Sequence, residues 1–306
     1  MKQRKSAEWT RLDNASKVFP ATCNDKDTKV FRFACELYEA VKPEILQQAL
    51  DITIDSFPLY KSVLRKGIFW YYLEASDIPA VVEIESYPVC APIYIKDRKN
   101  LLFRVFYYNN RINVEMFHAL TDGTGALWFI QTLVYNYLDL NYNKIYKGEK
   151  PDLDYNASIS QKMDDSFKRY FAGKGIFKLT AEDQKRKPNT RVYHIKGSRL
   201  DENRMNLIEG SMSAKSVLCE AHKYNATLTV FIASAFIYSI YKGMPVWDKN
   251  RFVVLSVPIN LRQFYESETA RNFFSTMKVG YCFKNGDTDF SEVVASVSES
   301  FKRELE

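Results

Sequence analysis

His118 is one of only three histidines in the chain, and it stands where a β-strand pattern ends. Asp122 follows four residues later, Gly123 comes next, and an apolar stretch with helical spacing begins there. Imidazole titrates at about pH 6.5, so His118 could take a proton from an alcohol, an amine or a thiol as that group attacks a substrate. The alternative interpretation is a core histidine with satisfied hydrogen bonds, and the residues alone leave both open.

Asp122 has two candidate roles in this pattern. Its carboxylate could cap the helix that begins at Gly123, because a side-chain oxygen there accepts backbone N–H groups of the first turn. It could also hold the turn rigid through an ion pair. Gly123 would allow a close backbone approach or an unusual φ angle at the corner.

The elements around these residues indicate a mixed fold in two lobes. Strand patterns cover 29–41, 66–76, 190–198, 250–262 and 273–283, with a strand pair at 100–119 joined at Asn109 and Asn110. Helical patterns cover 42–58, 122–142, 158–172, 213–225, 227–243 and 289–306, with Ser213 a candidate N-cap. The polar segment 173–189 is the predicted linker between an N-terminal lobe at 1–172 and a C-terminal lobe at 190–306. Strands and helices within each lobe favour an α/β fold built as α+β sandwiches.

The composition argues against several classes of protein. The net charge of +6 is spread along the chain, without the basic stripe of a nucleic-acid-binding protein. The longest apolar run, 227–241, falls short of the roughly 20 residues that span a bilayer. No secretory leader pattern and no C-x-x-C pair occur, so we expect a cytoplasmic protein with reduced thiols. A metal site is not expected, because His194 and His222 lie in the other predicted lobe.

The segment HALTDG at 118–123 fits the pattern H-x-x-x-D-G. Two further segments accompany it, LDNASKVFP at 12–20 and VPINLR with ETARNFFS at 257–275. With these three segments the chain resembles the chloramphenicol-acetyltransferase-like superfamily over nearly its whole length. It is most similar to the bacterial alcohol-acetyltransferase-like branch of that superfamily. The superfamily also contains the condensation domains of peptide synthetases.

The resemblance implies a two-lobed fold with a tunnel between the lobes and an acyltransferase activity. It implies that His118 is the general base that deprotonates a small alcohol or amine. Acyl-CoA, or the thioester of an acyl carrier protein, would be the acyl donor, with no permanently bound cofactor and no covalent acyl-enzyme. Asp122 would pair with an arginine of the second lobe, which Arg262 matches.

The sequence departs from that family pattern at two places. No segment like the family's D-F-G-W-G occurs near the C-terminus, so we expect an incomplete second lobe, either in a truncated chain or in a short relative of the family with an incomplete tunnel. This leaves open a non-catalytic binding or scaffold protein with the same fold. The other alternative is a carrier-protein-dependent condensation domain, whose motif usually has a second histidine where Phe117 stands here.

Overall fold

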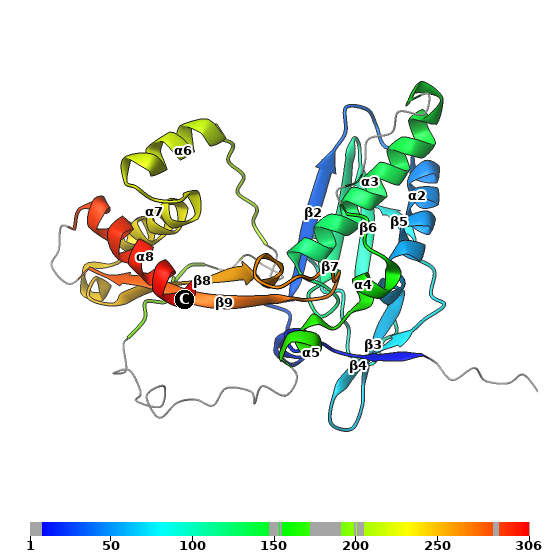
Figure 1. The fold of residues 1–306 in the computed structure, drawn as a ribbon, viewed down its shortest axis with the longest axis horizontal. Coiled ribbons are helices and arrows are strands. Elements are labelled where there is room, and N and C mark those ends of the chain that lie inside the picture. Colours follow the sequence, from blue (N-terminus) through cyan, green and yellow to red (C-terminus); the bar gives the residue numbers. More distant parts are fainter. Residues whose placement is uncertain are drawn as a thin grey trace, which may run out of the picture. The chain divides into compact units, whose positions relative to one another are not determined.

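The computed structural model describes residues 8–146, 153, 155–171, 191–198, 200, 205–283 and 288–305. These residues form two compact units (Figure 1). The first unit combines the N-terminal part of the chain with the distant segment 260–274, and the second unit holds the rest of the C-terminal part. The segment 260–274 therefore belongs to the first unit, although it lies inside the predicted C-terminal lobe. The predicted linker at 173–189 lies outside the described residues, so the predicted boundaries stay a prediction.

The first unit is built on a four-stranded sheet with two long helices. The strands run in the order β2-β7-β6-β5, with β5 parallel to β6 and the other pairs antiparallel: β2 (Val30–Glu36), β7 (Arg111–Phe117), β6 (Phe103–Tyr108) and β5 (Val82–Ile84). Helices α2 (Pro43–Ser56) and α3 (Gly123–Tyr146) pack on each other, with α3 near β2 and α2 near β5 (Figure 1). They therefore cover one face of the sheet. The core between them is rich in buried aromatic side chains: Phe57, Tyr60, Phe103 and Phe129.

A second, smaller sheet in the first unit corrects one prediction. The pattern at 66–76 predicted a single strand, but the structure has a hairpin of β3 (Ser62–Lys66) and β4 (Tyr71–Ala75). The short strand β1 (Trp9–Arg11) pairs with the free edge of β4. The turn falls at Gly67, whose N–H donates to the Trp70 carbonyl at 2.7 Å. The hydrophobic periodicity did not reveal the turn, because a turn of exposed apolar residues has the same residue types as a buried strand.

Short elements complete the first unit. They are the helices α1 (Val18–Thr22), α4 (Ile159–Met163) and α5 (Ser166–Phe171), and the 3₁₀ turns Pro58–Tyr60 and Leu261–Gln263. The helix predicted at 158–172 is thus two helices, and α4 begins with a capping box of Ser158 and Gln161. The predicted turn at Asn109 is confirmed, since Asn109 has a φ of 51° between β6 and β7.

In its described residues, the second unit packs three helices and a two-stranded sheet around its own core. The elements are α6 (Ala214–Lys223), α7 (Leu228–Gly243), the 3₁₀ turn Val246–Asp248, β8 (Phe252–Asn260), β9 (Phe274–Cys282) and α8 (Phe290–Leu305). Ser213 caps α6 as predicted, accepting the Ser216 N–H at 3.3 Å. The strand predicted at 190–198 is absent from its described residues, where Val192 forms only an isolated bridge to Phe252. No single helix in the described ranges is long and apolar enough to cross a bilayer, and α6 and α7 reach that composition only as a bent pair.

Candidate active site around His118

His118 directly follows the last residue of β7, as the sequence predicted. Its backbone N–H donates to the Lys29 carbonyl at 2.8 Å, which fixes the chain at the strand end. The imidazole stacks on Phe19 with ring centroids 4.2 Å apart and also contacts Phe31 and Phe274 at 5.0 and 5.5 Å. Burial among these rings lowers the pKa of His118 from its ordinary value, because desolvation penalises the imidazolium. Nearby acceptors oppose that shift, the His118 carbonyl and Asn272 first among them.

Asn272 determines which ring nitrogen of His118 is free. The Asn272 side-chain N–H groups donate to the His118 carbonyl at 3.0 Å and to Ser16 Oγ at 2.9 Å. Its Oδ1 therefore faces the ring, 3.1 Å from His118 Nδ1. An amide oxygen only accepts hydrogen bonds, so Nδ1 carries the proton in the neutral ring. Nε2 is then the unprotonated nitrogen, and its lone pair can take a proton from a substrate.

A buried polar chain holds Asn272 in this orientation. Ser16 Oγ, which accepts from Asn272, donates to Asp13 Oδ2 at 2.6 Å. Asp13 lies 3.7 Å from Arg271 Nε, and Arg271 Nη2 donates to the Arg11 carbonyl at 2.6 Å. Burial raises the pKa of Asp13, and the charge of Arg271 opposes that rise. The chain connects the segment before α1 to His118 through groups that are almost entirely shielded from water.

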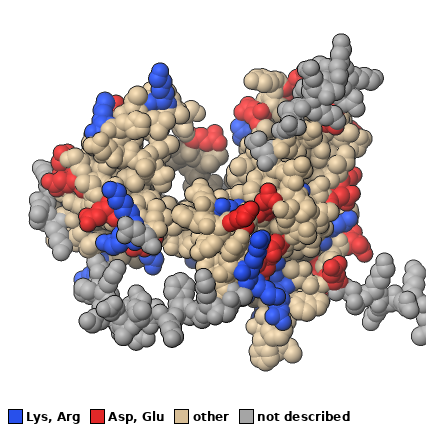
Figure 2. Space-filling view, in the orientation of Figure 1, with Lys and Arg blue, Asp and Glu red and all other residues tan. Residues whose placement is uncertain are grey.

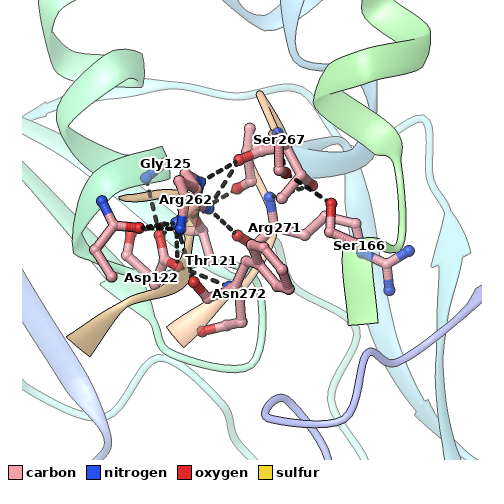
Figure 3. Close-up of polar contacts among 12 residues, drawn as sticks. Thr121, Asp122, Gly125, Ser166, Arg262, Ser267, Arg271 and Asn272 are labelled. Carbon is pink, nitrogen blue, oxygen red and sulfur yellow. Dashed lines mark hydrogen bonds and ion pairs between the residues drawn. The ribbon is translucent and has the colours of Figure 1, made fainter. Parts of the chain in front are cut away.

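The predicted ion pair of Asp122 and Arg262 is confirmed. Arg262 Nη1 lies 2.8 Å from Asp122 Oδ2, and Nη2 lies 3.3 Å from Oδ1 (Figure 3). Both side chains are only 6% exposed. The same carboxylate accepts the N–H of Gly125 at 3.0 Å and the N–H of Phe273 at 2.8 Å. Asp122 thus acts as a helix cap and as an ion-pair partner at once, so the two candidate roles do not exclude each other.

Arg262 is bound by protein groups on all sides. It lies in the 3₁₀ turn that follows β8, and donates to the Thr269 carbonyl at 2.8 and 3.1 Å and to the Arg271 carbonyl at 2.6 Å. Its guanidinium also lies over the Trp128 ring, 5.3 Å from the centroid. With every polar atom of the pair engaged, the geometry fits a structural role for Asp122 and Arg262 better than contact with a substrate.

The glycine that the fold requires is Gly125 and not Gly123. A methyl group added at Gly125 would lie 2.3 Å from the Ala270 carbonyl oxygen and 2.3 Å from Thr121 Oγ1. At Gly123 nothing lies within 4 Å, and its backbone is not in the left-handed region. The prediction that Gly123 supports the site through close approach or an unusual φ was therefore wrong. The close approach occurs two residues later, where α3 meets the segment that carries Ala270.

The structure brings His118, Asp122 and Arg262 into one constellation within the first unit. Sequence reasoning missed Asn272, Ser16 and Asp13 as members of it. All three lie inside the flanking segments 12–20 and 268–275 that carried the family resemblance. The three-residue spacing of Asp13 and Ser16 is a signal for a side-chain turn, but nothing in the sequence connects that turn to Asn272. In the described ranges, no group of three His, Cys, Asp or Glu could hold a metal ion.

Replacing Asp122 by asparagine should destabilise the protein by about 3–5 kcal/mol, because it leaves the Arg262 charge buried without its counter-charge. The free energy of unfolding from urea titrations would measure this. The double variant Asp122→Asn/Arg262→Met is the control, and it should lose less than the sum of the two single variants. A loss for Asp122→Asn of about 1 kcal/mol or less would mean that the residue is only a helix cap.

Gly125→Ala and Gly123→Ala form a matched pair in the first turn of α3. Gly125→Ala should destabilise the protein by about 1–3 kcal/mol, since the methyl group meets a backbone carbonyl that cannot move freely. Gly123→Ala should be neutral or slightly stabilising, because alanine favours a helix over glycine. Thermal unfolding of the two variants tests this contrast, and equal melting temperatures would contradict it.

The His118 ring should be a neutral Nδ1–H tautomer at neutral pH and should protonate below its ordinary pKa of about 6.5. Nitrogen NMR of histidine-labelled protein measures both properties, and with three histidines His118→Ala identifies its signals. In Asn272→Leu the ring loses the Oδ1 acceptor, and the Nε2–H form should increase. An Nε2–H ring in the unaltered protein would contradict the assignment of Nε2 as the free base.

No protein-family model matches the sequence, and no curated protein matches it. Solved structures do match. Polyketide synthase associated protein 5 from Mycobacterium tuberculosis is similar to this chain with a TM-score of 0.66 at 14% identity, covering 96% of this chain and 73% of that one. The first condensation domain of the calcium-dependent antibiotic synthetase gives 0.65 at 16% identity, covering 97% and 75%.

The starter condensation domain of rhizomide synthetase, solved in complex with C8-CoA, gives a TM-score of 0.64 at 13% identity, covering 97% of this chain and 72% of that domain. At such identities the likeness establishes the fold alone. The predicted chloramphenicol-acetyltransferase-like architecture is thereby confirmed, whereas the closeness to the alcohol-acetyltransferase branch stays a prediction. The chain has the mixed α/β fold of the condensation domains and of the polyketide-synthase-associated proteins.

Proposed function

We propose that the protein is an acyltransferase with His118 as its general base. The observation that carries the proposal is the His118 ring, whose Nδ1 is tied to Asn272 Oδ1 at 3.1 Å, which leaves Nε2 as the unprotonated nitrogen of the neutral ring. The lowered pKa favours the neutral ring at pH 7, which is the form that can accept a proton.

The chemistry of such a base is a direct acyl transfer. His118 Nε2 would take the proton of an alcohol or amine as its oxygen or nitrogen attacks the thioester carbonyl. The tetrahedral intermediate would then collapse with loss of the thiolate, and the imidazolium would return its proton to that sulfur. The base is restored after each turnover and no acyl-enzyme forms. We propose acyl-CoA as the donor because a condensation domain of the same fold was solved with C8-CoA; a carrier-protein thioester presents the same group.

Asp122 and Arg262 would support this chemistry without touching substrate. Four hydrogen bonds surround the carboxylate, so no lone pair of Asp122 is directed toward a ligand. Asp122 is also too fully engaged to act as the second group of a catalytic pair with His118. Asp122 is therefore proposed to position the site, with His118 the only group that exchanges a proton.

His118→Ala should lower the rate of CoA release from acetyl-CoA in the presence of a panel of small alcohols and amines by about 10²- to 10⁴-fold, the usual contribution of a general base. The thiol released would be measured with a thiol reagent, using longer acyl-CoA donors in parallel. The matched control is His222→Ala, which removes an exposed histidine on α6 and should leave the rate unchanged.

The outcomes separate the alternatives. Equal rates for the unaltered protein and His118→Ala would reject His118 as the base. Turnover only with a carrier-protein thioester would favour a condensation domain. Failure to turn over either donor, together with no calorimetric affinity for CoA, would favour the non-catalytic scaffold. We expect the rate of CoA release to be retained at pH values somewhat below 6.5, because the His118 ring stays neutral until the pH falls through its lowered pKa.

A further inference from the structure

The turn of the β3–β4 hairpin exposes three large apolar side chains in a row. Ile68 is 91% exposed, Phe69 85% and Trp70 59%. Single exposed apolar residues are common on protein surfaces, but three consecutive ones at the end of a projecting turn are not explained by packing. In Figure 2 the end of this hairpin is a tan projection with blue side chains directly behind it. We call residues 67–70 the hairpin tip.

The hairpin tip is a defined structure. Gly67 N–H donates to the Trp70 carbonyl at 2.7 Å, which closes the turn, and the rings of Phe69 and Trp70 lie 6.4 Å apart. Directly behind it, β3 and β4 are paired along their full length, from Lys66 opposite Tyr71 onward. The apolar side chains are therefore held out from the sheet by a paired hairpin.

A row of cations follows the hairpin tip. Arg65 and Arg11 both pair with Tyr72, one from each side of β4, so all three side chains share one face of the sheet. Lys66 is one residue closer to the tip and, because strand side chains alternate, lies on the other face of the hairpin. Between Lys61 and Leu73 there is no acidic residue. Arg65 is partly neutralised by Glu74 at 2.9 Å, but in the part of the chain that the structure describes Lys66 and Arg11 enter no ion pair.

We infer that the hairpin tip inserts into the interface of a membrane that carries anionic lipids. The order along the hairpin is apolar, then aromatic, then cationic, which matches the order of acyl chains, headgroup boundary and phosphates. Aromatic rings favour that boundary, and the cations behind the tip would meet the negative surface. The tip would dip into one leaflet without spanning the bilayer.

The exposure pattern favours a lipid layer over a protein partner. A flat protein interface covers one side of an element, whereas Ile68 and Phe69 at the end of the turn are 91% and 85% exposed and so are accessible from nearly all sides. Burying all of them requires a medium that surrounds the hairpin tip. A lipid layer does so without a shaped pocket, and the basic row fits its charge. The inference does not depend on the proposed acyltransferase activity.

Flotation with lipid vesicles tests the inference. The full chain should bind vesicles of phosphatidylcholine mixed with phosphatidylserine and bind pure phosphatidylcholine more weakly, with the difference reduced by salt. The variant Phe69→Ser/Trp70→Ser should bind the mixed vesicles at least about tenfold more weakly. Lys66→Glu should lose several-fold on mixed vesicles and little on pure phosphatidylcholine.

The matched control is Trp247→Ser, which removes a tryptophan that is 81% exposed in the second unit and should leave vesicle binding unchanged. Because residues 67–70 support no core, melting temperatures of the tip variants should equal that of the unaltered protein. No binding to either vesicle, or equal binding by Phe69→Ser/Trp70→Ser, would overturn the inference. Self-association on a sizing column that the double tip variant abolishes, without vesicle binding, would assign the tip to a protein contact and reject the membrane.

Discussion

The ion pair of Asp122 and Arg262 is the constraint on which the first unit's site depends. It joins two segments 140 positions apart in the sequence and buries both charges. Buried pairs of this kind contribute less to stability than their short distances suggest, because each charge loses its hydration. Their effect is on geometry. Once both groups are buried, a shift of the segment 260–274 relative to α3 that separated them would leave each buried charge without its partner. The ion pair therefore restricts where this segment can lie on α3.

His118 occupies an environment of a different kind. The Asp122 carboxylate is paired with Arg262 and fully hydrogen-bonded, whereas the His118 ring contacts Phe19 and Phe274 and has a hydrogen bond to a neutral amide at Nδ1. Desolvation of an imidazole without a full counter-charge favours the neutral ring. A carboxylate in place of Asn272 would favour the charged ring instead. The neutral amide fixes the orientation of the ring, and its hydrogen bond only partly offsets the lowering of the His118 pKa by burial.

The sequence predicted what local pattern controls. The helices α2, α3 and α7, the β6–β7 hairpin and His118 at the strand end follow from periodicity and turn chemistry. The choice between Gly123 and Gly125 could not be predicted, because it depends on where the Ala270 carbonyl meets α3. Asn272 was missed for the same reason. Its role comes from a contact 154 positions away in the sequence, and no periodic signal records such contacts.

The spacing of His118 and Asp122 has a geometric explanation in the segment that both of them bind. His118 is bonded to the side chain of Asn272, and Asp122 is bonded to the backbone N–H of the next residue, Phe273. Asn272 thus binds the His118 ring, and Phe273 binds the residue that caps the start of α3. Two neighbouring residues of the segment 260–274 therefore bind two residues that are four positions apart. Arg262, near the start of the same segment, holds the preceding residue through the Arg271 carbonyl. The aspartate four residues after the histidine therefore acts on the His118 ring indirectly, by holding Phe273, the neighbour of the residue that orients the ring.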